Sequence, residues 1–209
     1  MIKLGIGGQI GAGKSEVAKM LQEFFIADGY PTVIIKADEV AWGLYFPGSP
    51  VYKRILKAFG ENILDSQNQI DRKKLAQIVF SHRKHLNFLN QIVHPPLIKE
   101  ICVKLKNSPQ EIKILDAALL FMWGNKVPLD LRILVRAPNC QKIIRMKKKG
   151  FQPNEIKKRL SFQMDEDKME TLADFVIIND SSYKVLHERT YKLYQIIKAY
   201  FKEKLQLSS

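Results

Sequence analysis

Short, continuously apolar runs alternate along this chain with longer stretches in which apolar residues recur every three or four positions. The short runs predict strands buried on both faces of a parallel sheet, and the longer stretches predict amphipathic helices. Five runs have the length of a strand: residues 2–6, 32–36, 112–120, 131–135 and 175–178. The alternation therefore predicts a three-layer α/β fold, with helices on both faces of a five-stranded parallel sheet.

Two of the predicted helices have clear limits. An amphipathic helix over residues 14–28 is stopped by the group Gly29-Tyr30-Pro31. The last helix follows a cap at Ser181 or Ser182 and is expected to run to about Leu205. Its apolar side is expected to contain Val185, Leu193, Ile196, Ile197 and Tyr200.

The longest stretch without a strand signal covers residues 39–106. The group Pro47-Gly48-Ser49-Pro50 predicts a turn between two short helices, and Asp71 is expected to cap a helix that runs through Phe80. A longer helix over residues 84–106 is expected to kink or break at His94-Pro95-Pro96. The stretch exceeds a simple crossover between parallel strands, so it predicts a helical insertion that covers the site and supplies substrate contacts.

The pattern gives a single domain with three parts. Its core consists of residues 1–38, 107–140 and 172–209, and residues 39–106 form the insertion. Residues 141–171 are expected to form a lid of two helices, broken between Gly150 and Pro153.

A phosphate-binding loop lies between the first predicted strand and the first predicted helix. The residues Gly8-Gln9-Ile10-Gly11-Ala12-Gly13-Lys14-Ser15 fit the pattern G-x-x-x-x-G-K-[ST] without a mismatch. Its glycines let the backbone curl around phosphate oxygens at the positive end of a helix. We expect Lys14 to reach the β- and γ-phosphates and the Ser15 hydroxyl to ligate Mg²⁺. The loop predicts binding of a nucleoside triphosphate.

Two acids follow strands that are expected to border this loop. Asp38 comes directly after the second strand, and Asp116 lies near the end of the third. Ligands collect at the carboxyl ends of parallel strands, which places both acids near the loop. Asp38 is interpreted as a functional carboxylate or as the N-cap of a helix that begins at Glu39. Asp116 is expected to hold Mg²⁺ through water, or else to be a simple strand-end polar residue.

The formal net charge is +13 and the pI is near 9.7, and part of this charge is concentrated between residues 141 and 160. The bases there, set against the single acid Glu155, are Lys142, Arg145, Lys147, Lys148, Lys149, Lys157, Lys158 and Arg159. Such a balance is typical of a protein that binds nucleic acid, an anionic membrane surface or a polyanionic small substrate, and also of a merely lysine-rich surface. A basic groove interleaved with aromatic residues is missing from the sequence, which counts against nucleic acid.

Composition limits the other classes. Hydrophobic residues at 46% and charged residues at 26% are values of a globular chain. The sequence has no apolar run of membrane-spanning length, and a strand that begins at residue 2 leaves no room for a signal peptide. Cys102 and Cys140 stand far apart without a C-x-x-C spacing, so we expect reduced thiols in a cytoplasmic protein.

The classes of protein that contain a phosphate-binding loop differ in the other motifs that they carry. A GTPase would need a glycine after the third strand, where Asp116-Ala117-Ala118-Leu119 has none. It would also need an acid in its guanine motif, which Asn125-Lys126-Val127-Pro128 lacks. The chain is short for a motor ATPase, and its late basic segment lies where a small-molecule kinase carries a lid.

From the loop to Asn179, the sequence resembles the dephospho-CoA kinase family. After the loop, the matching segments are Ala37-Asp38-Glu39, Pro47-Gly48-Ser49-Pro50, Ile70-Asp71-Arg72-Lys73-Lys74-Leu75-Ala76, Leu89-Asn90-Gln91-Ile92-Val93-His94-Pro95 and Leu119-Leu120-Phe121. The resemblance implies ATP-dependent phosphorylation of the ribose 3′-hydroxyl of dephospho-CoA, with Mg²⁺ as cofactor. It also implies a P-loop kinase fold with a substrate-side insertion and a lid.

The resemblance gives roles to individual residues. Asp38, Lys14 and Arg145 become the catalytic candidates, with Asp38 accepting or orienting the acceptor proton. The ATP-binding candidates are Gly8, Gly11, Ala12, Gly13, Lys14, Ser15, Glu16, Arg145 and Asn179. The substrate-side candidates are Asp38, Asp71, Arg72 and His94, and the lid candidates are Lys148, Lys149, Arg159 and Gln163. His94 is as readily interpreted as a satisfied core residue, and Asp71 and Arg72 as a helix cap and a surface charge.

Several positions depart from the family pattern. Lys36 stands where an acid is common, Trp42 where arginine is frequent, and Met122 where a glutamate usually closes its motif. The expected partners are ATP and dephospho-CoA, without nucleic acid or membrane, and the sequence makes no prediction of oligomeric state. The alternatives are another P-loop small-molecule kinase, of nucleoside monophosphate or shikimate type, and a nucleic-acid-binding ATPase.

Overall fold

The computed structural model describes residues 1–202 and divides into two compact units. The first unit joins residues 1–36 to the residues from 104 onward, and the second contains residues 37–103. The first unit holds the sheet and the phosphate-binding loop. The second unit is built from helices.

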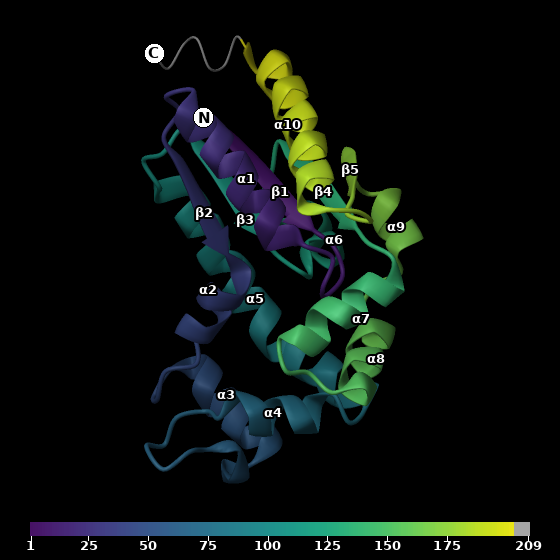
Figure 1. Ribbon diagram of the computed structural model, residues 1–209. Helices are drawn as coiled ribbons and strands as arrows, with labels where there is room; N and C mark the ends of the chain where they lie inside the picture. The colour runs from purple at the N-terminus through teal and green to yellow at the C-terminus, as the bar shows by residue number, and fades with distance from the viewer. Residues whose placement is uncertain (203–209) are drawn as a thin grey trace. The chain divides into compact units, whose positions relative to one another are not determined.

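A five-stranded sheet forms the centre of the first unit (Figure 1). Its strands are β1 (Ile2–Gly7), β2 (Thr32–Lys36), β3 (Ile112–Asp116), β4 (Leu131–Arg136) and β5 (Phe175–Ile178). Their order is β2-β3-β1-β4-β5, and every neighbouring pair is parallel. This confirms the five-stranded parallel sheet expected from the apolar runs. The β1 and β3 runs are buried almost throughout, as a parallel sheet requires, whereas β5 lies at the edge of the sheet and exposes Val176 and Ile178.

The third strand is shorter than its apolar run. β3 ends at Asp116, and the chain then turns, with the Ala117 amide donating to the Ile6 carbonyl at 3.0 Å. Leu120 and Phe121 belong to a short buried helix, α6 (Leu120–Trp123). A buried strand and a buried helical turn are equally apolar in sequence. The apolar run over residues 112–120 therefore could not show where the strand ended and the helix began.

The remaining helices of the first unit are α1 (Lys14–Ala27), α7 (Asn139–Lys148), α8 (Pro153–Phe162), α9 (Glu166–Glu170) and α10 (Tyr183–Tyr200), with a 3₁₀ turn at Gly124–Lys126. α1 and α10 pack together on one side of the sheet (Figure 1). Their apolar faces join strand residues in one core. The two lid helices predicted around Gly150 and Pro153 are present as α7 and α8.

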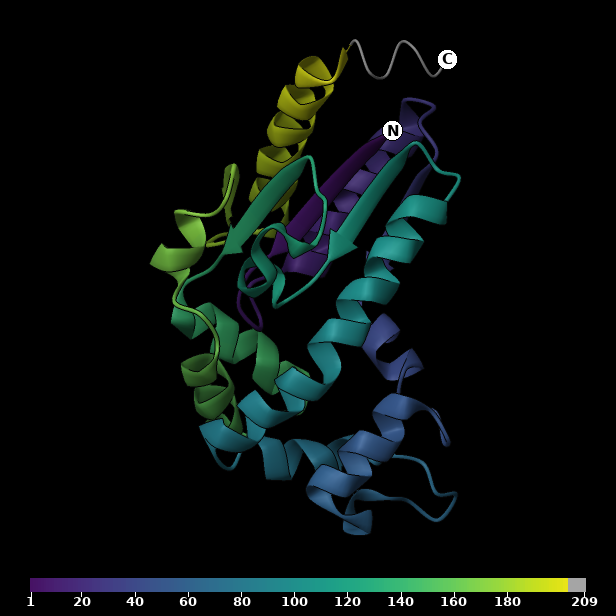
Figure 2. The same cartoon turned by 180° about the vertical axis from the view of Figure 1, so that it is seen from behind.

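The opposite face of β1 is covered by α6 and the loop that follows it, as the view from behind shows (Figure 2). A Cβ at Gly7 would lie 2.4 Å from the Phe121 ring, and one at Gly5 would lie 2.5 Å from Leu129. The two glycines therefore allow this cover to lie directly on the central strand.

The last helix shows a different buried face from the one expected. Ser182 caps it by accepting from the Val185 amide at 3.3 Å, and it ends at Tyr200; Leu205 lies outside the described residues. Leu193 and Ile197 are buried as predicted, whereas Ile196 is 51% exposed and Tyr200 is 71% exposed. The other buried positions of the helix are Leu186, Thr190 and Tyr194. Thr190 fits an apolar face because its hydroxyl donates to the Leu186 carbonyl at 2.8 Å.

The second unit contains α2 (Ala37–Gly43), α3 (Pro50–Phe59), α4 (Arg72–Val79) and most of α5 (Arg83–Asn107), with a 3₁₀ turn at Glu61–Ile63. Ser49 caps α3 and Asp71 caps α4, as the turn and cap signals predicted. Of the kink or break expected at Pro95 and Pro96, the break is absent, because α5 is continuous through both prolines, and the kink stays a prediction. Ile92, Val93, Leu97 and Ile101 are buried around this point, and their packing offsets the two missing N–H donors. Over residues 1–202, no helix has the length and apolar character needed to cross a membrane.

The buried face of α10 can be tested with two adjacent isoleucines. Ile197→Ala should lower the free energy of unfolding by roughly 2–5 kcal/mol, because Ile197 is 0% exposed and its removal leaves a cavity. Ile196→Ala is the matched control and should change it by less than about 0.5 kcal/mol. Denaturant unfolding of both variants measures this, and equal losses would contradict the placement of the helix.

Candidate active site

The phosphate-binding loop is shaped by glycines at positive φ. Gly8, Gly11 and Gly13 have φ values of +143°, +77° and +104°. A Cβ at Gly8 would lie 2.3 Å from the Val135 carbonyl oxygen, and one at Gly11 would lie 2.8 Å from the carbonyl oxygen of Lys142. The loop therefore depends on the absence of side chains, both for its conformation and for its close contact with neighbouring backbone.

The loop leads into α1, whose first residues are Lys14 and Ser15. The Lys14 ammonium donates to the main-chain oxygen of Gln9 at 3.4 Å. The Ser15 hydroxyl donates to the Asp116 carboxylate at the end of β3. The structure thus brings together the loop serine and the strand-end acid, which are 101 residues apart in sequence.

Asn179 and Arg145 brace the loop from the side of β5 and α7. Asn179 is 6% exposed and donates from its side chain to the Ala12 carbonyl at 2.8 Å. The Arg145 guanidinium donates to the carbonyl oxygens of Gly11 and Ala12, both at 3.2 Å, and to the Asn179 side-chain oxygen at 3.0 Å. Burial lowers the pKa of Arg145 from its ordinary value. Arg145 therefore positions the loop backbone, and its predicted role at the phosphates stays a prediction.

A cavity of about 590 Å³ opens beside the loop. Its lining includes the loop and the start of α1, the end of α7 and the residues around the start of α10. Among the residues lining it are Glu16, Lys148, Lys149, Asn179, Tyr183 and Leu186. An aromatic ring, an apolar side chain and several cations beside a phosphate-binding loop suit a ligand with both a base and phosphates.

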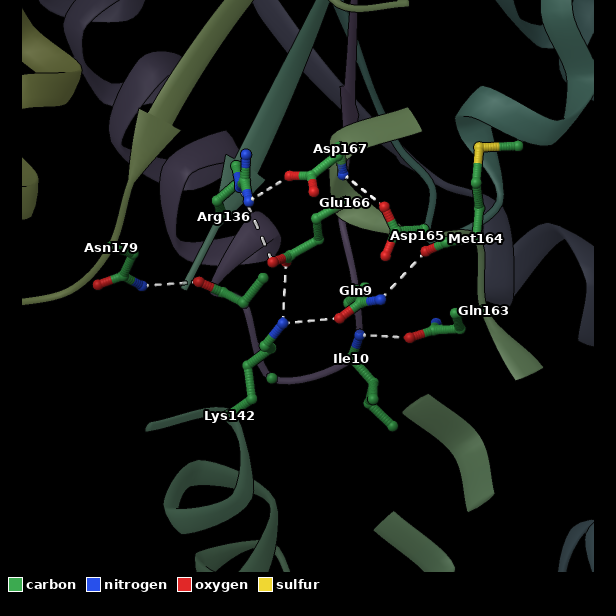
Figure 3. A network of polar contacts seen from close by, with 12 residues as sticks. Gln9, Ile10, Arg136, Lys142, Gln163, Met164, Asp165, Glu166, Asp167 and Asn179 are labelled. Carbon is green, nitrogen blue, oxygen red and sulfur yellow. Dashed lines mark hydrogen bonds and ion pairs between the residues drawn. The ribbon is translucent and has the colours of Figure 1, made fainter. Parts of the chain in front are cut away.

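A second set of polar contacts ties the loop to the segment after α8 (Figure 3). The Ile10 amide donates to the Gln163 side chain at 2.9 Å, and the Gln9 side chain donates to the Met164 carbonyl at 3.0 Å. The Lys142 ammonium donates to the Gln9 side-chain oxygen at 2.6 Å and lies 3.0 Å from a Glu166 carboxylate oxygen. Gln163, predicted as a lid residue, is therefore a direct partner of the loop.

Arg136 extends this set of contacts on the far side of Glu166. Its guanidinium pairs with Glu170 and Asp167 on α9 and lies 3.9 Å from Glu166. Burial alone would lower the pKa of Arg136, but the hydrogen bonds that its guanidinium donates to Glu170 and Asp167 raise that pKa. The segment after α8 is thus anchored both to β4 and to the loop.

Arg159 lies on α8 and is engaged within the lid. Its guanidinium donates twice to Glu155, at 3.0 Å and 2.8 Å, and lies 4.9 Å from the centre of the Phe151 ring. Together with the pairing of Lys142 and Glu166, this shows that part of the basic cluster has internal partners.

The substrate-side candidates lie in the second unit. Asp38 is exposed in the first turn of α2, which begins one residue earlier, so its interpretation as the cap of a helix starting at Glu39 is wrong. Burial and the charge of Asp38 raise the pKa of the Tyr45 phenol, which places this carboxylate near Tyr45.

Among the other candidates in this unit, Asp71 and Arg72 contact neighbouring residues of the same unit. Asp71 accepts from the amides of Lys74 and Lys73, which lowers its pKa, so its cap function is established by geometry. Arg72 is exposed, with its guanidinium 4.2 Å from the centre of the Trp42 ring. His94 is half-buried on α5. Their predicted substrate contacts stay predictions.

Gln9, Lys142 and Glu166 were not predicted as site residues. Lys142 was interpreted only as part of a basic cluster, although it is 1% exposed. One sequence signal pointed to it: Lys142 precedes the buried Met146 by four residues, so it occupies an apolar-face position of α7.

The oxygen ligands near the loop suit Mg²⁺. A serine hydroxyl and a carboxylate in contact are hard donors of the kind this ion prefers, and the loop supplies few enough of them to leave room for phosphate oxygens. Within residues 1–202 there is no group of three or more His, Cys, Asp or Glu residues that could hold a metal by itself.

The family of the chain follows from its match to a family model. The model described as dephospho-CoA kinase matches residues 2–184. The chain belongs to the dephospho-CoA kinase family. This confirms the resemblance inferred from the ordered motifs, and the family's activity is the final step of coenzyme A biosynthesis.

Curated dephospho-CoA kinases are similar over almost the whole chain. The enzyme of Aquifex aeolicus is 36% identical over 198 residues, which cover 93% of this chain and 97% of that protein. The enzyme of Carboxydothermus hydrogenoformans is 37% identical over 196 residues, with 92% of each chain covered.

Solved structures agree on the fold. A protein from Thermus thermophilus is similar with a TM-score of 0.73 and 28% identity, covering 93% of this chain and 96% of the other. Dephospho-CoA kinase from Campylobacter jejuni gives a TM-score of 0.61 and 25% identity over the same shares. A shikimate kinase from Acinetobacter baumannii, at 13% identity and a TM-score of 0.52, shows the shared P-loop kinase fold alone.

The close approach at Gly8 gives a direct test of the loop. Gly8→Ala should weaken ATP binding by at least about tenfold, because strain at positive φ and the contact with Val135 force the loop to move. Gly29→Ala is the matched control: Gly29 also has positive φ, at +87°, but a Cβ there would meet nothing within 4 Å. Calorimetric titration with ATP compares the two, and tight binding by the Gly8 variant would contradict the loop geometry.

Proposed function

We propose that this chain transfers the γ-phosphoryl group of ATP to the ribose 3′-hydroxyl of dephospho-CoA, giving coenzyme A and ADP. The observation that carries the proposal is the contact of Ser15 with Asp116 at the start of α1, in a chain that belongs to the dephospho-CoA kinase family. The contact supports a binding position near Ser15 and Asp116 for a divalent cation and the terminal phosphates of ATP.

ATP is proposed to occupy the cavity beside the loop. Its phosphates would lie against the amides of Gly8 to Ser15 and the Lys14 ammonium, with the base toward Asn179 and Tyr183. Arg145 and Glu16 line this cavity and would contact ATP there, while the Ala12 carbonyl, which accepts from Arg145, would help to hold the loop in shape. Lys148 and Lys149 would face the phosphates from the lid.

Ser15 and Asp116 are the residues that would hold Mg²⁺, Ser15 directly and Asp116 through water. The ion would neutralise charge on the β- and γ-phosphates. The chain's own contribution is to orient these phosphates by loop amides and Lys14, so that the γ-phosphorus is open to attack from the side away from ADP.

Asp38 is proposed to serve the acceptor. The 3′-oxygen forms a bond to the γ-phosphorus while the bond from that phosphorus to the β–γ bridging oxygen breaks, and the bridging oxygen leaves on ADP. The proton of the hydroxyl passes to, or is oriented by, the Asp38 carboxylate. The proposal is supported by the position of Asp38 directly after β2, two residues beyond Lys36, which is in register with Asp116.

The remaining candidates complete the proposal. Arg159 and Gln163 would belong to a lid over residues 141–171 that excludes water during transfer, and Asp71, Arg72 and His94 would contact the acceptor from the insertion over residues 39–106. We also propose that the chain acts in the cytoplasm, where the thiols of Cys102 and Cys140 would stay reduced.

The activity is tested with a panel of acceptors. Conversion of ATP to ADP with Mg²⁺ should be stoichiometric with added dephospho-CoA, should yield coenzyme A, and should stop when EDTA removes the metal. AMP, CMP, shikimate and single-stranded DNA serve as comparison acceptors. Turnover with one of these but not with dephospho-CoA would overturn the proposed substrate.

The role of Asp38 is tested by removing its charge. Asp38→Asn should lower kcat by at least about a hundredfold while changing KM much less, because the loss affects proton acceptance. Glu39→Gln removes the neighbouring charge in the same helical turn and should leave kcat within about threefold. A near-normal kcat for Asp38→Asn would show that this carboxylate is not the acceptor base.

A further inference from the structure

Lys142 carries a positive charge in a place that disfavours it. Its side chain is 1% exposed, and it lies in the first turn of α7, where the helix dipole is positive. Taking an ammonium out of water costs several kcal/mol unless partners replace the lost hydration. Its partners are the Gln9 side-chain oxygen at 2.6 Å and the Glu166 carboxylate at 3.0 Å (Figure 3).

Gln9 connects this buried charge to the catalytic lysine of the loop. Its side chain bonds to Lys142 on one side and to the Met164 carbonyl on the other, which fixes the residue at both ends of its amide. The main-chain oxygen of the same residue accepts from the Lys14 ammonium at 3.4 Å and from the Ala12 amide at 3.1 Å. Gln9 therefore contacts the buried charge through its side chain, and Lys14 and Ala12 through its main-chain oxygen.

A separate contact supports the same arrangement. A Cβ at Gly11 would lie 2.8 Å from the Lys142 carbonyl oxygen and 3.0 Å from its Cα, so the loop backbone rests directly on the backbone of Lys142. Side chain and main chain of one residue thus contact two points of the loop, Gln9 and Gly11.

We propose that Lys142 is a positioning residue for the phosphate-binding loop, acting through Gln9 and held in place by Glu166. With this latch of three residues closed, the loop amides are preorganised for the phosphates of ATP. The inference rests on the proposed binding of ATP by the loop. It goes beyond that proposal in assigning control of ATP affinity to a buried ion pair outside the loop.

The first variant is Lys142→Met, which keeps the length of the side chain and removes the ammonium. Affinity for ATP, measured by calorimetry and as KM, should fall about tenfold, because the loop loses a fixed conformation. KM for dephospho-CoA should stay within about twofold. The melting temperature should also fall, since Glu166 loses a close cationic partner.

A second variant separates positioning from stability. Glu166→Gln in the Lys142→Met background removes the buried carboxylate and should restore much of the lost melting temperature, while ATP affinity stays about tenfold weak. Recovery of both quantities together would overturn the proposal, and so would unchanged ATP affinity in Lys142→Met. Direct titration measures ATP affinity without any acceptor. It therefore tests the role of Lys142 even if dephospho-CoA is not the acceptor, and failure of this proposal can be distinguished from failure of the proposed function.

Two further variants complete the design. Gln9→Ala should weaken ATP binding to a similar extent, and the double variant Gln9→Ala with Lys142→Met should be little worse than either single one, because both break one latch. Fully additive losses would contradict action through Gln9. Lys198→Met is the matched control: it removes an ammonium paired with Asp28 far along α10 and should leave ATP affinity unchanged.

Discussion

The structure of the first unit depends on how closely the phosphate-binding loop packs against neighbouring backbone and side-chain atoms. At Gly8 the neighbour is the carbonyl of Val135 on β4, and at Gly11 it is the backbone of Lys142 on α7. At Gly13 it is the side chain of Asn179, just after β5. These contacts hold the loop against elements that are far away in the sequence.

The positively charged side chains around this loop fall into two groups. The cations near the cavity, Lys14, Lys148 and Lys149, line space that phosphates would fill. Lys142, Arg136 and Arg159 instead pair with acids of the segments around α8 and α9. The net positive charge of the chain thus includes cations that line the cavity and cations that are paired with acids. Composition alone does not distinguish these two groups.

Local signals predicted much of the fold and part of the site. The five strands, the cap at Asp71, the glycine loop and the acid at the end of β3 each depend on a few adjacent residues, so the sequence could show them. The bond between Lys142 and Gln9 joins residues 133 positions apart, and no local pattern encodes it. The errors at α10 and β3 have a related cause: apolar periodicity indicates that a segment is buried, but here it did not fix the phase of the helix or the end of the strand.

The main-chain oxygen of Gln9 has a consequence for the energy of nucleotide entry. This oxygen accepts from both the Lys14 ammonium and the Ala12 amide. In the proposed complex with ATP, Lys14 would turn to a phosphate while the Ala12 bond remained, so the Gln9 carbonyl would keep a donor. The reorganisation energy of binding would then be confined to one flexible side chain, and ATP could be exchanged for ADP without a change in the loop backbone.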